Sequence, residues 1–389
     1  MRLTCLLCLL GLAFADAASA EVRLEPGALI DLGWVSSETG RLYNQHTQGD
    51  SQFDPYRMRL FLDAEVAPGL TVFTQAILHE GLMPLVLDGA YARWTPWSDL
   101  DLHVQAGKIP WPIGTFGPRT YSDRNRLIGS PLMYQHHTSL AWDAVAVDVD
   151  HLVSAAGTGQ TGLDYGGGHS YGMVVVDDRW WDFGIAAIGS SHGVEFSLGA
   201  TQSTPGWPEP NPDDTPGNGY LGRIGLVPIP ELRVGVSGAY GPWMPTWSAW
   251  ALPPGGSLRD YIEAMVMADV ALSHDRFEVL AEGYHKSFET LRTGTLRMQG
   301  GYLEASAMMP AGWWLAARGE VMRFDDVTPS VGPARPWDDD LDRIEIGAGY
   351  RVTKDARLKM AWQRNRLRPA SAGTRNEDLI ALSMSIRLR

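Results

Sequence analysis

Cysteine is nearly absent from this chain of 389 residues, which contains only Cys5 and Cys8. Both lie in an apolar run, residues 3–14, that is followed by a small-residue site ending at Ala20. This layout predicts a secretory signal peptide over residues 1–20, cleaved after Ala20. We therefore expect a mature chain that has no disulfide, no thiolate nucleophile and no cysteine metal ligand.

Long hydrophobic runs and an excess of basic charge are missing as well. No later stretch approaches the roughly twenty apolar residues of a membrane-spanning helix, and the mean hydropathy is -0.14, which excludes a helical membrane protein. The formal net charge of -13 argues against nucleic acid as a partner. Three acidic clusters flanked by Pro and Gly favour solvated loops over a calcium site; they are Asp213-Asp214, Asp325-Asp326 and residues 338–340.

Alternation with a period of two is the feature that the sequence does contain. Between Tyr56 and Val66, apolar side chains alternate with Arg57, Arg59 and Asp63. Segments of about ten residues with this pattern, separated by turn residues, indicate β-strands. The first five are expected near residues 28–36, 56–66, 70–80, 85–94 and 100–109.

Short and long connections between these segments alternate. Long polar linkers are expected near residues 37–55, 110–139, 203–217, 242–259, 325–340 and 367–376. An outer-membrane barrel requires this asymmetry, with short periplasmic turns and long external loops. We therefore predict that residues 21–389 form one closed antiparallel transmembrane β-barrel, all-β and surrounded by lipid, in the outer membrane of a Gram-negative bacterium. It would have about 18 strands, or about 16 if residues 140–201 contribute fewer.

The last segment of the chain has one wholly apolar face. Ile380, Leu382, Met384, Ile386 and Leu388 alternate with polar or small residues. Because every backbone group must be paired in lipid, this strand is expected to pair with the first one and close the barrel. Six tryptophans near the expected strand ends suit the level of the lipid headgroups; they are Trp34, Trp94, Trp97, Trp313, Trp314 and Trp362.

The polar faces of the strands would line the lumen with charges of both signs. The basic candidates are Arg57, Arg59, Arg93, Arg223, Arg233, Arg318, Arg343, Arg351, Arg357 and Lys359, and the acidic ones are Asp63, Glu65, Glu263, Asp269, Glu278, Glu282, Glu304, Glu320 and Glu345. Because unpaired buried charges are costly, such an interior needs water around it. A barrel of this size is wide enough to hold a water-filled channel.

The linker over residues 110–139 is too long for a plain hairpin loop and carries Arg119, Arg124, Arg126 and His136. Folded inward, it would constrict the pore and favour anions through its guanidinium groups. Alternatively, it packs against other loops outside the barrel. No third metal ligand lies near His136 and its neighbouring histidine, so we expect no metal site.

Three early segments resemble strands of the phosphate-selective porins, the porin O/P family. They are Phe53–Leu60 (FDPYRMRL), Leu87–Trp94 (LDGAYARW) and Gly107–Gly114 (GKIPWPIG). The resemblance covers about the first third of the chain. It implies a water-filled barrel that conducts anions, an inward loop, basic residues along the path and assembly as a homotrimer. The chain differs from this family in its mixed lumen charge, and it lacks the terminal aromatic residue that outer-membrane barrels commonly have.

These features predict a passive channel for small hydrophilic solutes with a slight preference for anions. The pore-lining or constriction candidates are Arg57, Arg59, Arg93, Arg119, Arg124, Arg126, His136, Arg318, Arg351 and Lys359. The alternative is a barrel that acts as a scaffold or sleeve for a protein partner. An enzyme is not expected, because no informative Gly-x-Ser-x-Gly pattern occurs and Ser191 and His192 would point in opposite directions on a strand. No cofactor is expected either.

Overall fold

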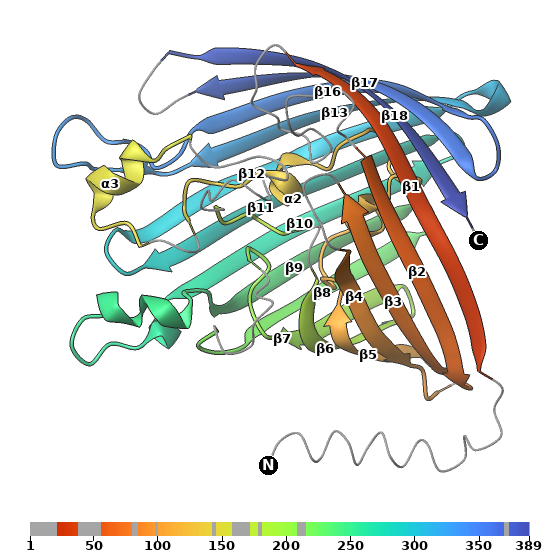
Figure 1. The fold of residues 1–389 in the computed structure, drawn as a ribbon, viewed down its shortest axis with the longest axis horizontal. Coiled ribbons are helices and arrows are strands. Elements are labelled where there is room, and N and C mark those ends of the chain that lie inside the picture. The colour runs from red at the N-terminus through yellow and green to blue at the C-terminus, as the bar shows by residue number, and fades with distance from the viewer. Residues whose placement is uncertain are drawn as a thin grey trace.

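Sixteen strands form one closed antiparallel barrel (Figure 1). The computed structural model describes residues 22–37, 56–79, 85–97, 100–141, 145–157, 172–177, 181–207, 215–368 and 373–388. The predicted closed all-β barrel is confirmed, with the lower of the two expected strand numbers. The predicted signal peptide and the cluster Asp213-Asp214 lie outside the described residues.

The barrel strands are 8 to 15 residues long, enough to cross a hydrocarbon core at a tilt. Their bounds are β1 (Arg23–Ser37), β2 (Tyr56–Ala67), β3 (Leu70–His79), β4 (Val86–Trp94), β5 (Asp101–Ile109), β6 (Asp182–Ser191), β7 (Val194–Thr201), β8 (Gly219–Ile229), β9 (Leu232–Pro242), β10 (Ile262–His274), β11 (Phe277–Thr290), β12 (Gly294–Met308), β13 (Trp313–Phe324), β16 (Asp340–Arg351), β17 (Ala356–Arg368) and β18 (Arg375–Leu388). The first five overlap the predicted ranges. Between residues 140 and 201 the barrel gains only β6 and β7, which accounts for the number sixteen.

The barrel closes as the apolar face of the last strand predicts. β18 pairs with β1 in antiparallel register, with Ile386 opposite Ile30. On β2 the predicted alternation is also present: Leu62 is 45% exposed on the outside, whereas Arg57 and Arg59 point inward and are buried. An apolar exterior over a polar interior suits a barrel that is surrounded by lipid.

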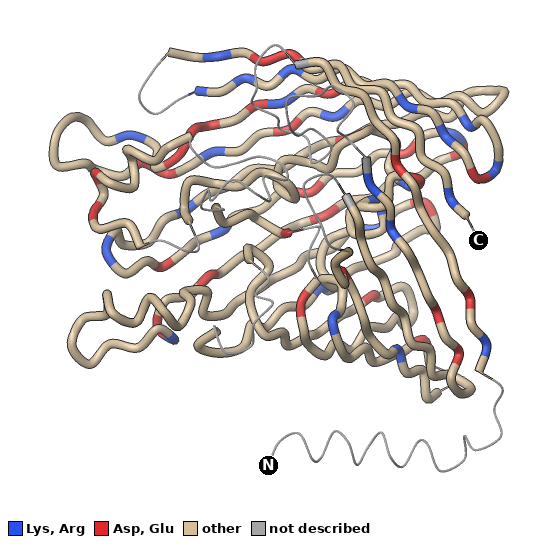
Figure 2. Tube along the Cα trace, viewed as in Figure 1, with Lys and Arg blue, Asp and Glu red and all other residues tan. Residues whose placement is uncertain are grey.

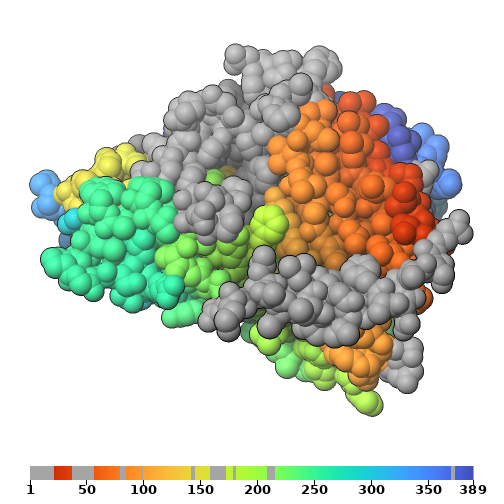
Figure 3. Space-filling model, turned by 60° about the horizontal axis from the view of Figure 1, so that its bottom comes forward, coloured from red at the N-terminus to blue at the C-terminus, as the bar shows by residue number. Residues whose placement is uncertain are grey.

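The two ends of the barrel differ in their connections. Short turns lie at the end where β1 begins and β18 ends, on the right in Figure 1. Long connections lie at the other end and contain α3 (Val149–Ser154), η3 (Thr246–Ala251), η4 (Leu258–Asp260) and the hairpin of β14 (Asp326–Val327) and β15 (Arg335–Pro336). The 243–261 connection, in blue-green, projects there (Figure 3). The strict alternation of short and long connections is wrong for β11 and β12, which only residues 291–293 join.

No helix in the described part of the chain has the length and apolarity needed to cross a membrane.

The tryptophans near the short-turn end fall into two groups. Trp94, Trp97 and Trp313 are exposed on the outer surface, as an interfacial belt requires. Trp314 does not fit that prediction, because its side chain faces inward and is buried, and its Nε1 donates a 2.9 Å hydrogen bond to the carbonyl of Arg126. A Cβ atom on Gly349 would overlap the Trp314 ring, so glycine on β16 provides the room for this side chain.

Candidate functional site

Residues 110–141 and 172–177 of the connection between β5 and β6 lie inside the barrel. We call residues 110–177 the inserted segment; the structure describes 110–141, 145–157 and 172–177, with η1 (Gly117–Thr120) and α2 (Leu132–Gln135) among them. Side chains of strands on several sides of the wall contact its backbone: Ser237 Oγ accepts from Gly114 N at 3.0 Å, Lys359 Nζ donates to Ser122 O at 2.9 Å, and Arg318 Nη2 donates to Gly129 O at 2.9 Å. Of the two positions considered for residues 110–139, the structure has the inward one.

Wall carboxylates replace the backbone partners that this irregular segment lacks. Glu282 Oε1 accepts hydrogen bonds from the amides of Thr115 at 2.5 Å and Phe116 at 3.1 Å. Its Oε2 accepts a 2.6 Å hydrogen bond from the hydroxyl of Tyr134. Because a buried amide without a partner costs free energy, these contacts fix the path of the inserted segment across the lumen.

Arg318 joins three carboxylates on the inner wall. Its guanidinium lies 3.0 Å from Glu304, 2.8 Å from Glu320 and 2.6 Å from Glu345, and all four side chains are at most 2% exposed. These residues belong to β12, β13 and β16, and charges of both signs are intermingled along the strands (Figure 2). The expectation that water solvates the lumen charges is therefore wrong for this group, since they compensate one another beneath the inserted segment.

The last part of the inserted segment is held by a second buried ion pair. Lys286 Nζ lies 2.7 Å from Glu263 Oε1, with both side chains at most 1% exposed. The same ammonium group donates to the carbonyls of Val174 at 2.8 Å and Val175 at 2.6 Å. All three N–H donors of the lysine thus have partners, which is how a buried ammonium group is accommodated.

Apolar side chains of the inserted segment pack against an apolar part of the inner wall. Phe116 stacks on Tyr134 with ring centroids 5.0 Å apart. The shared core contains Phe116, Leu132, Met133, Tyr134, Met173 and Val175 from the segment and Met267, Tyr284, Phe288, Leu296, Met298 and Met322 from the wall. Burial of apolar surface stabilises by roughly 25 cal/mol per Å². The segment is therefore a packed structural element that fills this side of the lumen.

The long connection between β13 and β16 also holds the inserted segment in place through hydrogen bonds. Asp338 accepts hydrogen bonds from Ser139 N at 2.6 Å, Ser139 Oγ at 2.7 Å and Gly157 N at 2.8 Å. Burial raises the pKa of the Asp338 carboxyl to about 6. The prediction of a solvated loop is wrong for Asp338 and Asp339, which are 2% and 5% exposed, because they face the inserted segment rather than water.

Most of the predicted pore-lining residues have partners in the wall or in the inserted segment. Two of them form ion pairs: Arg57 with Asp31 at 3.4 Å, and Arg119 with Glu278. Two donate hydrogen bonds to backbone carbonyls of the inserted segment, Arg59 to Thr120 at 2.9 Å and Lys359 to Ser122 and Leu127, both at 2.9 Å. The guanidinium of Arg126 lies 5.7 Å from the centre of the Trp314 ring. Arg318 is buried in its carboxylate group. Arg351 is exposed at the short-turn end of β16.

His136 follows α2 and is buried beside the inner wall. Burial and the nearby charge of Arg343 lower its pKa to about 3, so the ring is neutral at ordinary pH. Its neighbour His137 has Nδ1 2.8 Å from the carbonyl of Gly172. Within the described residues, no group of three His, Cys, Asp or Glu side chains could hold a metal ion.

Ser191 and His192 do not point in opposite directions as predicted. His192 lies in the turn after β6 with a φ of 51°, so its ring folds back and Nδ1 lies 2.8 Å from Ser191 Oγ. This pair is exposed at the short-turn end. Strand geometry was the wrong assumption, because the chain reverses at this point.

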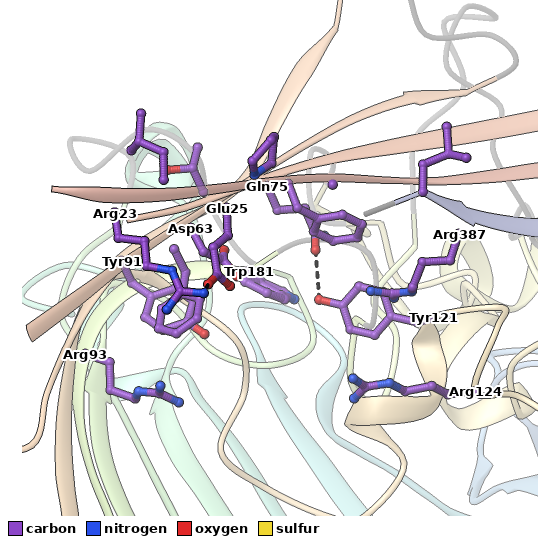
Figure 4. Close-up of a pocket in the computed structure, with 17 residues that line it drawn as sticks. Arg23, Glu25, Asp63, Gln75, Tyr91, Arg93, Tyr121, Arg124, Trp181 and Arg387 are labelled. Carbon is purple, nitrogen blue, oxygen red and sulfur yellow. Dashed lines mark hydrogen bonds and ion pairs between the residues drawn. The ribbon is translucent and has the colours of Figure 1, made fainter. Parts of the chain in front are cut away.

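A cavity of about 850 Å³, which we call the chamber, lies at the short-turn end between the inserted segment and the β1–β4 wall. Arg23, Arg93, Arg124 and Arg387 line it together with Glu25 and Asp63 (Figure 4). Arg23 pairs with Glu25 at 3.0 Å, and Arg387 pairs with Asp123 of the inserted segment at 2.7 Å. In the described part of the chain, the guanidinium groups of Arg93 and Arg124 form neither an ion pair nor a hydrogen bond.

Aromatic side chains form the other part of the chamber wall. On one side, Phe73 and Tyr91 are stacked with centroids 5.0 Å apart, and Tyr91 lies 6.0 Å from Trp181. On the other side, Phe61 lies 5.9 Å from Tyr121. The Tyr121 hydroxyl donates a 2.8 Å hydrogen bond to Gln75, which anchors the inserted segment to β3 (Figure 4).

Sequence reasoning missed these aromatic residues. Phe73 and Tyr91 lie on the inward face of β3 and β4, and the alternation that placed Arg93 in the lumen could also have placed them there. No sequence signal indicates Tyr121 or Trp181, because both lie outside the strands and reach the chamber only through the path of the chain across the lumen.

No family model and no curated protein sequence matches this chain. Solved outer-membrane proteins share its fold. The anion-selective porin of Comamonas acidovorans has 10% identity and a TM-score of 0.56, with 95% of this chain and 100% of that chain covered. The outer membrane channel DcaP of Acinetobacter baumannii has 8% identity and a TM-score of 0.55, with 95% and 97% covered. The trimer form of OmpT, an outer membrane protein of Vibrio cholerae, has 8% identity and a TM-score of 0.55, with 95% and 100% covered. The chain therefore has the closed-barrel fold of these proteins.

Proposed function

We propose that this protein is a porin of the outer membrane, a passive channel for small hydrophilic solutes with a preference for anions. The observation that carries the proposal is the chamber, a cavity inside a closed barrel into which Arg93 and Arg124 extend guanidinium groups. The apolar exterior and the likeness in fold to an anion-selective porin support it. In this proposal residues 1–20 are removed, and the short turns face the periplasm.

The charges of the chamber are the reason why we propose a preference for anions. Arg23 with Glu25 and Arg387 with Asp123 form two ion pairs, so Arg93 and Arg124 against Asp63 leave one positive charge in excess. Guanidinium groups bind carboxylates and phosphates through paired hydrogen bonds. A basic wall in a narrow passage raises the local concentration of anions. The resemblance of the first third of the chain to phosphate-selective porins, and assembly as a homotrimer, belong to the same proposal.

Planar-bilayer recording tests this function. The processed protein, folded in detergent, is added to a bilayer with a gradient of KCl across it. We expect discrete conductance steps and a reversal potential closer to the equilibrium potential of chloride than to that of potassium. Protein that is folded by the heat-modifiability test but yields no steps would contradict the proposal.

The packing of the inserted segment favours a second candidate, a filled barrel that acts as a scaffold for a protein partner. Phe116 and Leu132 lie in a core that closes one side of the lumen. A scaffold would copurify in fixed proportion with a different protein and would give no conductance. A porin would copurify with copies of itself.

A further inference from the structure

The chamber combines two kinds of surface that a simple ion path does not need together. Phe73, Tyr91 and Trp181 form a continuous row of rings, and the guanidinium of Arg93 lies 4.7 Å from the centre of the Phe73 ring. An arginine over a ring face keeps its outer N–H groups free to bind an anion, while the rings offer an apolar platform beside it.

The opposite side of the chamber repeats this arrangement. Arg124 of the inserted segment lies 5.8 Å from the centre of the Tyr121 ring. Figure 4 shows Arg93 and Arg124 reaching into the space from opposite sides, with Trp181 between them. A molecule in this space would meet a cationic group and an aromatic face on either side.

The size and charge of the chamber restrict which molecules it can bind. The volume of about 850 Å³ exceeds what a hydrated chloride ion requires and lies within the range of small-molecule sites. Asp63 is the one acidic side chain of the chamber that no described residue holds in an ion pair, and it disfavours a second negative charge nearby. A small molecule with one carboxylate and one aromatic ring satisfies both surfaces.

We infer that the chamber is a binding site for aromatic carboxylates, with Arg93 or Arg124 holding the carboxylate and Tyr91 and Trp181 contacting the ring. The inference rests on the proposed channel function and names the class of solute that the channel would select. Stacking on Tyr91 and Trp181 separates such a solute from an aliphatic acid of the same charge.

Isothermal titration calorimetry of the folded, detergent-solubilised protein tests the inference with three probes: benzoate, acetate and phenethylamine. Benzoate should bind at least tenfold more tightly than acetate, which has the charge without the ring. It should also bind more tightly than phenethylamine, which has the ring with the opposite charge. Equal binding of benzoate and acetate, or tighter binding of phenethylamine, would overturn the inference.

Two sets of variants locate the site. The double variant Arg93→Gln with Arg124→Gln should weaken benzoate binding at least tenfold, and Trp181→Leu should reduce the ratio of benzoate to acetate affinity. Arg233→Gln is the matched control, because Arg233 is a half-exposed lumen arginine that does not line the chamber. Heat-modifiability confirms that each variant is folded. Unchanged benzoate binding in the folded double variant would overturn the assignment.

Bilayer recording and benzoate titration of the same protein distinguish a failure of this inference from a failure of the channel proposal. Conductance steps without benzoate binding would support the channel proposal and overturn the proposed site for aromatic carboxylates. Benzoate binding without conductance steps would leave the chamber as a binding site of a barrel that does not conduct.

Discussion

Arg318 and Glu345 lie directly opposite each other on β13 and β16, with Nη2 and Oε2 2.6 Å apart and both side chains fully buried. They point into the lumen, where an open barrel would hold water. Gly129 and Ile128 of the inserted segment cover the pair, through a hydrogen bond from Arg318 to the Gly129 carbonyl and another from the Ile128 amide to Glu345. The wall and the inserted segment therefore form one packed unit.

Replacing Arg318 should destabilise this unit. Arg318→Met leaves Glu304 and Glu345 buried without their cation and leaves Glu320 with only Arg343, 3.7 Å away. Breaking buried ion pairs in this way costs about 3–5 kcal/mol. We expect the unfolding free energy, measured by urea titration in detergent, to fall by that amount. Arg276→Met is the control, since its pair with Asp275 is exposed and the variant should change stability little. Equal effects of the two variants would contradict the buried network.

Phe116→Ala should loosen the inserted segment. Phe116 is fully buried against Tyr134 and Tyr302, and removal of such a ring from a core costs about 3–5 kcal/mol. The backbone contacts to Glu282 remain, so we expect the barrel to close but the segment to fluctuate. Hydrogen exchange of residues 114–134 should rise while that of β10–β13 stays slow. An equal rise in exchange across both regions would contradict the expected local loosening of the segment.

His136 should make stability depend on pH in a defined window. The unfolded chain takes up a proton on this ring near its ordinary pKa of 6.5, whereas the folded protein does so only near 3. Its contribution is therefore complete above pH 6.5 and is lost as the pH falls toward 3. His136→Gln should flatten the pH dependence of the unfolding free energy between these values. An unchanged slope in the variant would assign the dependence to other groups.

Gly89→Ala should narrow the chamber. A Cβ atom at Gly89 would overlap the ring of Trp181, so the indole must shift from the β4 backbone toward the cavity. We expect a smaller single-channel conductance with little change in stability. Gly319→Ala is the matched control, because a Cβ atom there meets nothing within 4 Å. A similar conductance in both variants would show that Trp181 does not border the path.

Much of the fold follows from the sequence, because a β-strand between lipid and lumen must alternate. That rule gave the inward direction of Arg57 and Arg59, the outward direction of Leu62 and the closure of β18 on β1. It failed at Trp314, where two adjacent tryptophans have to face opposite sides and the pattern does not say which one is inside.

The lumen was harder to predict, because alternation shows where a side chain points but not what it meets. Lys359 and Arg318 do point inward, yet each donates a hydrogen bond to a carbonyl group of the inserted segment that lies more than 180 residues away in the chain. Asp338 illustrates the same limit, since its buried contacts with Ser139 depend on the path of the segment across the barrel. Arg93 and Arg124 come together for that reason as well.

The most direct test of the central claim compares reversal potentials under a KCl gradient for the unmodified protein, for Arg93→Gln with Arg124→Gln, and for Arg233→Gln. If anions pass through the chamber, the unmodified protein and the Arg233 variant should have the same reversal potential, closer to the equilibrium potential of chloride than to that of potassium. The reversal potential of the double variant should shift toward the equilibrium potential of potassium. An identical reversal potential in all three would contradict a path through the chamber.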